Sequence, residues 1–304
     1  YFLASVPEYD RIEIRKSKTI NELFKAPSVI VWKKHLDGDM SELIWAPEIH
    51  YIDKKWYIYF AAAPNKEVTG ITFNHRMYVI ECLDADPLTG TWTEKGQIKT
   101  GWESFSLDAT ILQHKGKLYY IWAQEDRNVN YESHSNIYIA EMENPWTLRT
   151  KPVMLTQPLL DWEIKIFWVN EGPAILKKNG KIFLTYSASA TDENYCMGML
   201  VVNENDDLLD PKSWKKLEKP VFKTSYKNKQ YGPGHNSFTV SEDGMKDLLV
   251  YHARNYTDIE GDPLYDPNRH TRVQVIEWDK DGFPIFGEPV MDTRNVDFDS
   301  LRKK

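Results

Sequence analysis

The stretch Pro47-Glu48-Ile49-His50-Tyr51-Ile52-Asp53-Lys54-Lys55-Trp56-Tyr57-Ile58-Tyr59-Phe60 sets the pattern of the chain: a short strand, a polar turn and an aromatic strand. The same pattern returns at residues 109–122, 173–186 and 237–252. Successive aligned positions are 62, 64 and 66 residues apart: Trp56, Leu118, Ile182 and Leu248. Self-similarity at a nearly fixed period is typical of repeat architectures such as β-propellers.

Further strand-like runs complete the repeat. Two such runs follow each copy, and residues 1–5 fit the second strand of an earlier copy. Four strands per copy and five copies predict an all-β, five-bladed β-propeller that occupies residues 1–304 as a single unit. Two β-sandwiches are the alternative, and they fit the regular period less well.

The first copy is shorter than the others. In the full copies the inner strand begins about ten residues before the aromatic strand, and no room for it exists before Tyr1. We therefore expect the first blade to lack its innermost strand in this chain.

Composition excludes several classes of protein. A net charge of −7 argues against nucleic-acid binding, which normally requires a basic footprint. No run of about 18 apolar residues is present, so no membrane span is expected. Cys82 and Cys196 lie too far apart in sequence to indicate a disulfide framework or a zinc site.

Polar residues stand near the starts of the predicted inner strands, which line the channel of a propeller. They are Glu48, Asp108, Glu171 and His235. A carboxylate entering an apolar strand is costly unless it is paired or hydrogen-bonded. Any one of them alone is compatible with a structural role, but their recurrence favours a shared site on the axis.

Four motifs around these residues, in order, resemble glycoside hydrolase family 43. They are Trp-Ala-Pro-Glu at 45–48, Leu-Asp-Ala-Thr at 107–110, Asn-Glu-Gly-Pro at 170–173 and Gly-Pro-Gly-His-Asn at 232–236. The resemblance covers essentially the whole chain. It implies a five-bladed propeller that hydrolyses arabinofuranosides or xylosides with inversion. Residues 6–13 are similar to the branch that holds exo-acting α-L-arabinofuranosidases.

The resemblance also implies catalytic roles. Glu171 matches the general acid, and Asp108 matches the carboxylate that tunes the pKa of that acid and orients it. The general base would be an Asp on the innermost strand of the first blade, which is expected to lie outside this chain. Asp10 follows the aromatic strand, on the wrong side of the blade, and is not expected to replace it.

Other residues are candidates for binding. His235 is predicted either to hold an axial metal ion, Ca²⁺ or Na⁺ in oxygen-rich surroundings, or to be a hydrogen-bonded structural histidine. Trp45 and Trp168 are predicted to stack on sugar rings or to pack between blades. Arg272 is predicted to bind sugar hydroxyls, to fix a carboxylate or to be an ordinary strand arginine. Glu48 is expected to be structural, at the border of the pocket.

Three functions remain open from the sequence. The first is release of terminal α-L-arabinofuranose from arabinan or arabinoxylan oligosaccharides by an inverting mechanism. The alternatives are a β-xylosidase of the same family and a non-catalytic sugar-binding propeller. The expected partner is a plant cell-wall oligosaccharide or polysaccharide, without nucleic acid or membrane, and a secreted or periplasmic location is favoured over the cytoplasm.

Overall fold

The computed structural model describes residues 1–126, 128 and 134–292. Within these residues nearly all regular structure is β-strand. The helical elements are three short 3₁₀ turns: η1 (Ile20–Glu22), η2 (Pro211–Ser213) and η3 (Pro263–Tyr265). No helix of the described residues has the length and apolarity that a membrane span requires.

Four antiparallel sheets follow one another in chain order. The first contains β3 (Glu42–Ile52), β4 (Lys55–Ala63), β7 (Arg76–Cys82) and β8 (Trp92–Gln97). The second contains β9 (Ser106–His114), β10 (Lys117–Gln124), β11 (Asn136–Asn144), β12 (Thr147–Leu148) and β13 (Val153–Thr156). The third contains β14 (Asn170–Lys178), β15 (Lys181–Ala188), β16 (Cys196–Asn203) and β17 (Lys215–Lys216). The fourth contains β18 (Tyr231–Val240), β19 (Asp247–Arg254) and β20 (His270–Val275).

Three smaller pairs of strands complete the described structure. They are β1 (Arg11–Arg15) with β2 (Ser28–Lys33), β5 (Val68–Thr69) with β6 (Thr72–Phe73), and β21 (Glu277–Trp278) with β22 (Pro284–Ile285). Phe2 extends the first pair through an antiparallel bridge to Arg15.

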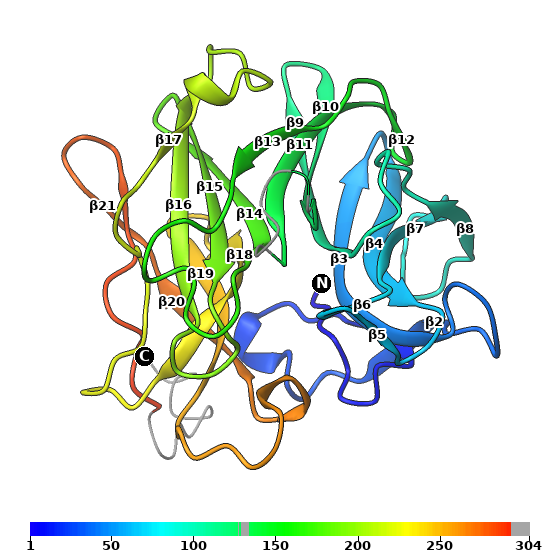
Figure 1. Cartoon of the computed structure of the whole chain (residues 1–304), viewed down its shortest axis with the longest axis horizontal. Helices are drawn as coiled ribbons and strands as arrows, with labels where there is room; N and C mark the ends of the chain where they lie inside the picture. The colour runs from blue at the N-terminus through cyan, green and yellow to red at the C-terminus, as the bar shows by residue number, and fades with distance from the viewer. Residues whose placement is uncertain (127, 129–133, 293–304) are drawn as a thin grey trace.

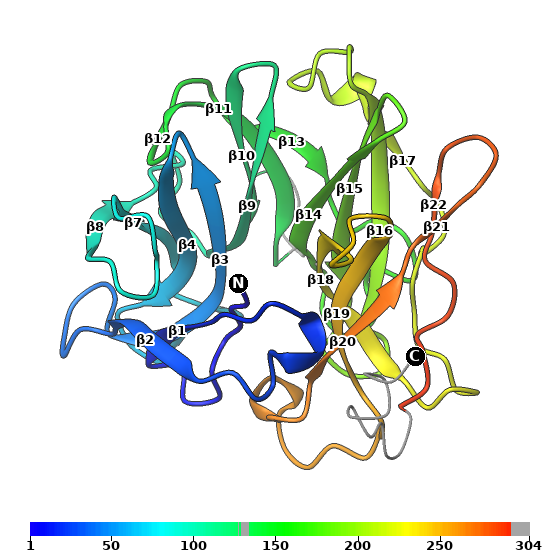
Figure 2. The ribbon, with the colours of Figure 1, turned by 180° about the vertical axis from the view of Figure 1, so that it is seen from behind.

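The sheets are arranged around a common centre as the blades of a propeller, seen from its two sides in Figures 1 and 2. The first strands of the four large sheets lie innermost, since β3 contacts β9, β9 contacts β14 and β14 contacts β18. The predicted all-β propeller is therefore confirmed, with four blades. The count of five blades stays a prediction; the smaller β1–β2 sheet precedes the four large sheets in the chain.

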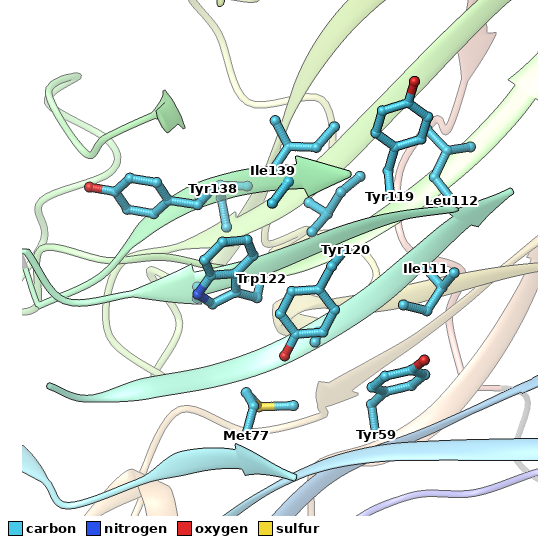
Figure 3. Close-up of a cluster of buried hydrophobic side chains, with 14 of the residues drawn as sticks. Tyr59, Met77, Ile111, Leu112, Tyr119, Tyr120, Trp122, Tyr138 and Ile139 are labelled. Carbon is cyan, nitrogen blue, oxygen red and sulfur yellow. The ribbon is translucent and has the colours of Figure 1, made fainter. Parts of the chain in front are cut away.

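Apolar side chains between adjacent blades form the core. Figure 3 shows one such cluster, in which Tyr59 and Met77 of the first large sheet face Tyr120 and Trp122 of the second. Trp122 is fully buried. Because burial of one large apolar side chain contributes about 1.5–3 kcal/mol, these contacts hold neighbouring blades in fixed relative positions. The aromatic residues that define the repeat are thus mainly packing residues.

Candidate active site

Each inner strand contains a β-bulge at the same place. One residue of each bulge has a left-handed backbone, and the pairing register shifts around it. These residues are 62, 64 and 63 positions apart: Ala46, Asp108, Gly172 and His235. An extra residue in one strand bends that strand and redirects its side chains. The repeated bulge therefore turns polar side chains of β9, β14 and β18 toward one another.

The four predicted polar residues do not all occupy the same position relative to the bulge of their strand. Asp108 and His235 occupy corresponding bulge positions, Glu171 precedes the bulge residue of β14, and Glu48 follows that of β3 by two positions. The site is thus assembled from neighbouring positions and not from a single repeated one.

Asp108 and the strand that carries Glu171 are directly joined. The backbone N–H of Gly172 donates a hydrogen bond to Oδ2 of Asp108 at 3.0 Å. Asp108 is 5% exposed, and its Oδ2 also lies 3.7 Å from Nδ1 of His235. Three inner strands therefore meet at this one carboxylate.

Burial and mutual repulsion raise the pKa of Glu171 into the neutral range. Loss of solvation raises the pKa of Glu171 to about 7, and the negative charge of Asp108 adds to this increase. Burial also raises the pKa of Asp108, to about 7, with a contribution from Glu48 and an opposing one from the N–H of Gly172. Two carboxyl groups that share a desolvated site do not both ionise readily. A carboxylic acid in such a site can donate a proton at neutral pH.

Glycines of the fourth motif make room for the site. A Cβ on Gly234 would lie 2.4 Å from the ring of Tyr195, and one on Gly232 would lie 2.2 Å from the backbone oxygen of Asp192. Gly172 has φ +55° and packs against the ring of His235, 3.3 Å from an added Cβ. Side chains at these positions would displace the loop that carries Tyr195 or the ring of His235.

Tyr195 and Arg269 also act on the site, and neither was expected from the sequence. The hydroxyl of Tyr195 donates a hydrogen bond to Oε1 of Glu171 at 2.7 Å. The positive charge of Arg269 acts on the ionisation of Asp108, Glu171 and His235 together, which places this cation beside the site. Neither residue lies in an inner-strand motif. Arg269 stands three positions before the predicted Arg272, and no spacing marks Tyr195.

Glu48 lies at the edge of this group. Its Oε1 accepts a hydrogen bond from Oγ1 of Thr110 at 2.5 Å and lies 2.8 Å from Nε2 of His50. The side chain is 34% exposed. Glu48 therefore links β3 to β9 at the margin of the site.

The predicted sugar-binding residues are placed in different environments. Trp45 is 8% exposed and stacks on His75, with ring centroids 4.0 Å apart. Trp168 is half-buried, and its backbone N–H donates to Nδ1 of His134 at 3.3 Å. Arg272 makes a two-point contact with Asp292 through Nε and Nη2, at 3.1 and 3.0 Å. Trp45 thus packs within the protein and Arg272 binds a carboxylate, as one of the alternatives predicted for each. Contacts of either residue with a sugar stay predictions.

Among the described residues, few side chains could join His235 as ligands of the predicted metal ion. Burial lowers the pKa of His235, so the imidazole is neutral, as a metal ligand requires. Yet residues 1–126, 128 and 134–292 contain no group of three or more His, Cys, Asp or Glu side chains that could hold a metal. A Ca²⁺ or Na⁺ ion there would depend on water and carbonyl oxygens.

A buried glutamate anchors the segment before Glu171. Glu163 is fully buried and accepts hydrogen bonds from the N–H groups of Leu159 and Leu160, both at 2.9 Å. It also accepts from the side chains of Asn170 and Tyr186. Lys216 completes the network with an ion pair at 2.7 Å, and burial lowers the pKa of this lysine.

We expect Glu163→Ala to destabilise the protein by about 3–5 kcal/mol, because it leaves the half-buried charge of Lys216 and the buried donors of Asn170 and Tyr186 without their acceptor. Denaturant unfolding measures this change, and Glu277→Ala at an exposed position is the control. A loss below about 1 kcal/mol, the range of an exposed ion pair, would contradict the structural role of Glu163.

The family model described as "Glycosyl hydrolases family 43" matches residues 1–284. A Streptomyces avermitilis protein named extracellular exo-α-(1→5)-L-arabinofuranosidase is 56% identical over 292 residues, which are 96% of this chain and 60% of that protein. A Streptomyces chartreusis protein of the same name is 51% identical over 263 residues, 86% of this chain and 78% of that protein. This chain therefore spans only about three fifths of the Streptomyces avermitilis relative.

A solved structure is similar over nearly the whole chain. The α-L-arabinofuranosidase from Lactobacillus brevis superposes with a TM-score of 0.95 and 62% sequence identity, covering 97% of this chain and 91% of that one.

Proposed function

The chain belongs to glycoside hydrolase family 43, and from this premise we propose that it is an inverting, exo-acting α-L-arabinofuranosidase. Its substrates would be the terminal α-L-arabinofuranosyl groups of arabinan or arabinoxylan oligosaccharides. The observation that carries the proposal is the pair formed by the buried Asp108 and the half-buried Glu171, whose environment raises the pKa of Glu171 to about 7. The names of the Streptomyces and Lactobacillus relatives support the choice of sugar.

In the proposed reaction Glu171 transfers its proton to the glycosidic oxygen as the bond from that oxygen to the anomeric carbon breaks. Water attacks the anomeric carbon from the opposite face and gives its proton to a carboxylate base about 6.5–9.5 Å from the acid. The family resemblance assigns that base to the innermost strand of the first blade, and this assignment stays a prediction. Asp108 raises the pKa of Glu171 and fixes the backbone next to it.

We assign supporting roles to the remaining candidates. Trp168, half-buried three residues before Glu171, would offer a ring face to the sugar. Arg269 would supply the cation near the bound sugar, while Trp45 and Arg272 would shape the wall of the site through their contacts within the chain. No step is assigned to an axial ion.

We further infer that residues 1–33 belong to the predicted first blade, which would be the fifth blade of the ring. Ile12, Ile14 and Trp32 pack against β4 residues of the first large sheet. On the other side the hydroxyl of Tyr9 donates to the backbone oxygen of Leu264 at 3.0 Å, and the N–H of Ile20 donates to Glu242 at 2.8 Å. These contacts support a sheet that closes the ring between the first and fourth large sheets. The word extracellular in the names of the Streptomyces relatives supports export of the protein.

Hydrolysis of two aryl glycosides tests the proposed activity. We expect the full-length protein to release 4-nitrophenol from the α-L-arabinofuranoside much faster than from the β-D-xyloside, because exo-acting sites are shaped around one terminal sugar. A reversed preference would favour the β-xylosidase alternative. Binding of arabino-oligosaccharides without any hydrolysis would favour the sugar-binding alternative.

A further inference from the structure

Tyr195 reaches Glu171 from outside the inner strands. It lies just before β16, is 1% exposed, and places its hydroxyl 2.7 Å from Oε1 of Glu171. A second tyrosine–glutamate hydrogen bond, from Tyr186 of β15 to Glu163, is also 2.7 Å long but belongs to the anchoring network. The two pairs have the same chemistry, and only one of them involves the proposed acid.

The ring of Tyr195 is held by His252 on one face and by the backbone at Gly234. His252 stacks on it with centroids 5.5 Å apart and an interplanar angle of 13°. On the side of Gly234 the ring occupies the space that a Cβ would need, at 2.4 Å. Because the ring cannot turn without displacing these neighbours, its hydroxyl stays directed at Glu171.

The direction of the hydrogen bond is set by a chain of donors. The backbone N–H of His235 donates to Oγ of Ser187 at 2.7 Å. Ser187 in turn hydrogen-bonds the hydroxyl of Tyr195. With its oxygen lone pair engaged by Ser187, Tyr195 donates its own proton to Glu171. Burial raises the pKa of Tyr195 well above its ordinary value, so this proton is retained at all pH values near neutrality.

From this geometry we propose that Tyr195 is the positioning residue of the acid: it occupies Oε1 of Glu171 and thereby keeps the transferable proton on Oε2. The proposal rests on the proposed glycosidase function of the same site. During the reaction Oε2 gives its proton to the leaving glycosidic oxygen and Glu171 becomes a carboxylate, while Tyr195 keeps its proton throughout.

The same bond favours the transition state. A hydrogen bond to a charged acceptor is roughly twice as strong as one to a neutral acceptor. The bond from Tyr195 therefore strengthens as negative charge develops on Glu171, and an interaction that is stronger in the transition state than in the ground state accelerates the reaction. The effect should depend on how much the leaving group needs the proton.

The variant Tyr195→Phe removes only the hydroxyl. For hydrolysis of α-1,5-arabinobiose we expect kcat to fall about 10- to 100-fold with KM nearly unchanged, as for the loss of a hydrogen bond to a charged group. For an aryl arabinofuranoside with a good leaving group, which needs little protonation, we expect a loss below about threefold. The ratio of the two losses is the readout, because a general loss of active protein would affect both substrates equally.

Tyr186→Phe is the matched control, since it removes the same hydroxyl from the equivalent bond to Glu163. It should lower the denaturation midpoint and leave the ratio of the two rates unchanged. A second test uses the Glu171→Gln background, where Tyr195→Phe should cause no further loss because no acid remains to be positioned.

The outcomes separate the proposal from the function on which it rests. An equal loss on both substrates in Tyr195→Phe, or an additive loss in the Glu171→Gln background, would overturn the positioning role. A wild-type protein that hydrolyses no arabinofuranoside would instead overturn the proposed function. If Tyr195→Phe does not fold, Ser187→Ala removes the donor to Tyr195 and should give the same selective loss, in smaller measure.

Discussion

Glu171→Gln is expected to keep the fold and to lose about 10²–10⁴-fold of the rate on natural arabinofuranosides, the usual contribution of a general acid. An amide cannot donate the proton that a poor leaving group needs. The oxygen of Gln still accepts the hydrogen bond from Tyr195, so the surrounding structure should be preserved. Steady-state rates on an arabino-oligosaccharide and on an activated aryl glycoside measure the effect.

The two substrates must respond differently. The aryl glycoside should lose much less activity, because its leaving group departs without full protonation. Glu277→Gln, the same change at an exposed position, is the control and should alter neither rate. Losses of equal size on both substrates would show that Glu171 is not the acid.

Asp108→Asn is expected to lower activity and to move the basic limb of the pH–rate profile to lower pH. The sign follows from the requirement that Glu171 be protonated: removal of a negative neighbour favours ionised Glu171, so the acid is lost at a lower pH. Burial is the larger cause of the raised pKa of Glu171. The basic limb should therefore move only part of the way from about pH 7 toward 4.5, the ordinary pKa of a glutamate. The oxygen of Asn can still accept the N–H of Gly172, so the bulge should be kept.

Glu48→Gln is the control for this shift. Glu48 acts on the ionisation of Asp108 and His235 but is not among the charges that act on Glu171. Its replacement should therefore leave the basic limb nearly in place. If Asp108→Asn lowers the rate strongly and the limb does not move, Asp108 positions the substrate or the strand and does not tune Glu171.

The repeat could be predicted from the sequence because packing between blades constrains every copy alike. Alternating apolar and aromatic residues such as Tyr57 and Tyr59 are required wherever a blade faces its neighbour, so the period is visible in the residues. The predicted outer strands also form, as β7, β11, β16 and β20. For the same reason the proposed first blade is harder to predict: β1 and β2 form a small sheet with few residues in the pattern.

The details of the site depend on features without a sequence period. The bulges that turn Asp108 and His235 inward arise from left-handed backbone at residues of four different types. Tyr195 acts from an adjacent loop, through space left by Gly234, a contact that spacing along the chain does not reveal. For Trp45 the sequence leaves open whether the ring stacks on a sugar or packs between blades, because its stacking on His75 depends on a residue 30 positions away.

The central claim is that this site hydrolyses α-L-arabinofuranosides by single displacement, with Glu171 as the acid. The most direct measurement is ¹H NMR of the anomeric proton during the first moments of hydrolysis by the full-length protein, before the sugar equilibrates in water. An inverting reaction releases β-L-arabinofuranose first, and the α anomer then appears by mutarotation. Initial release of the α anomer would require a covalent intermediate on a nucleophile close to Glu171, and it would contradict the account.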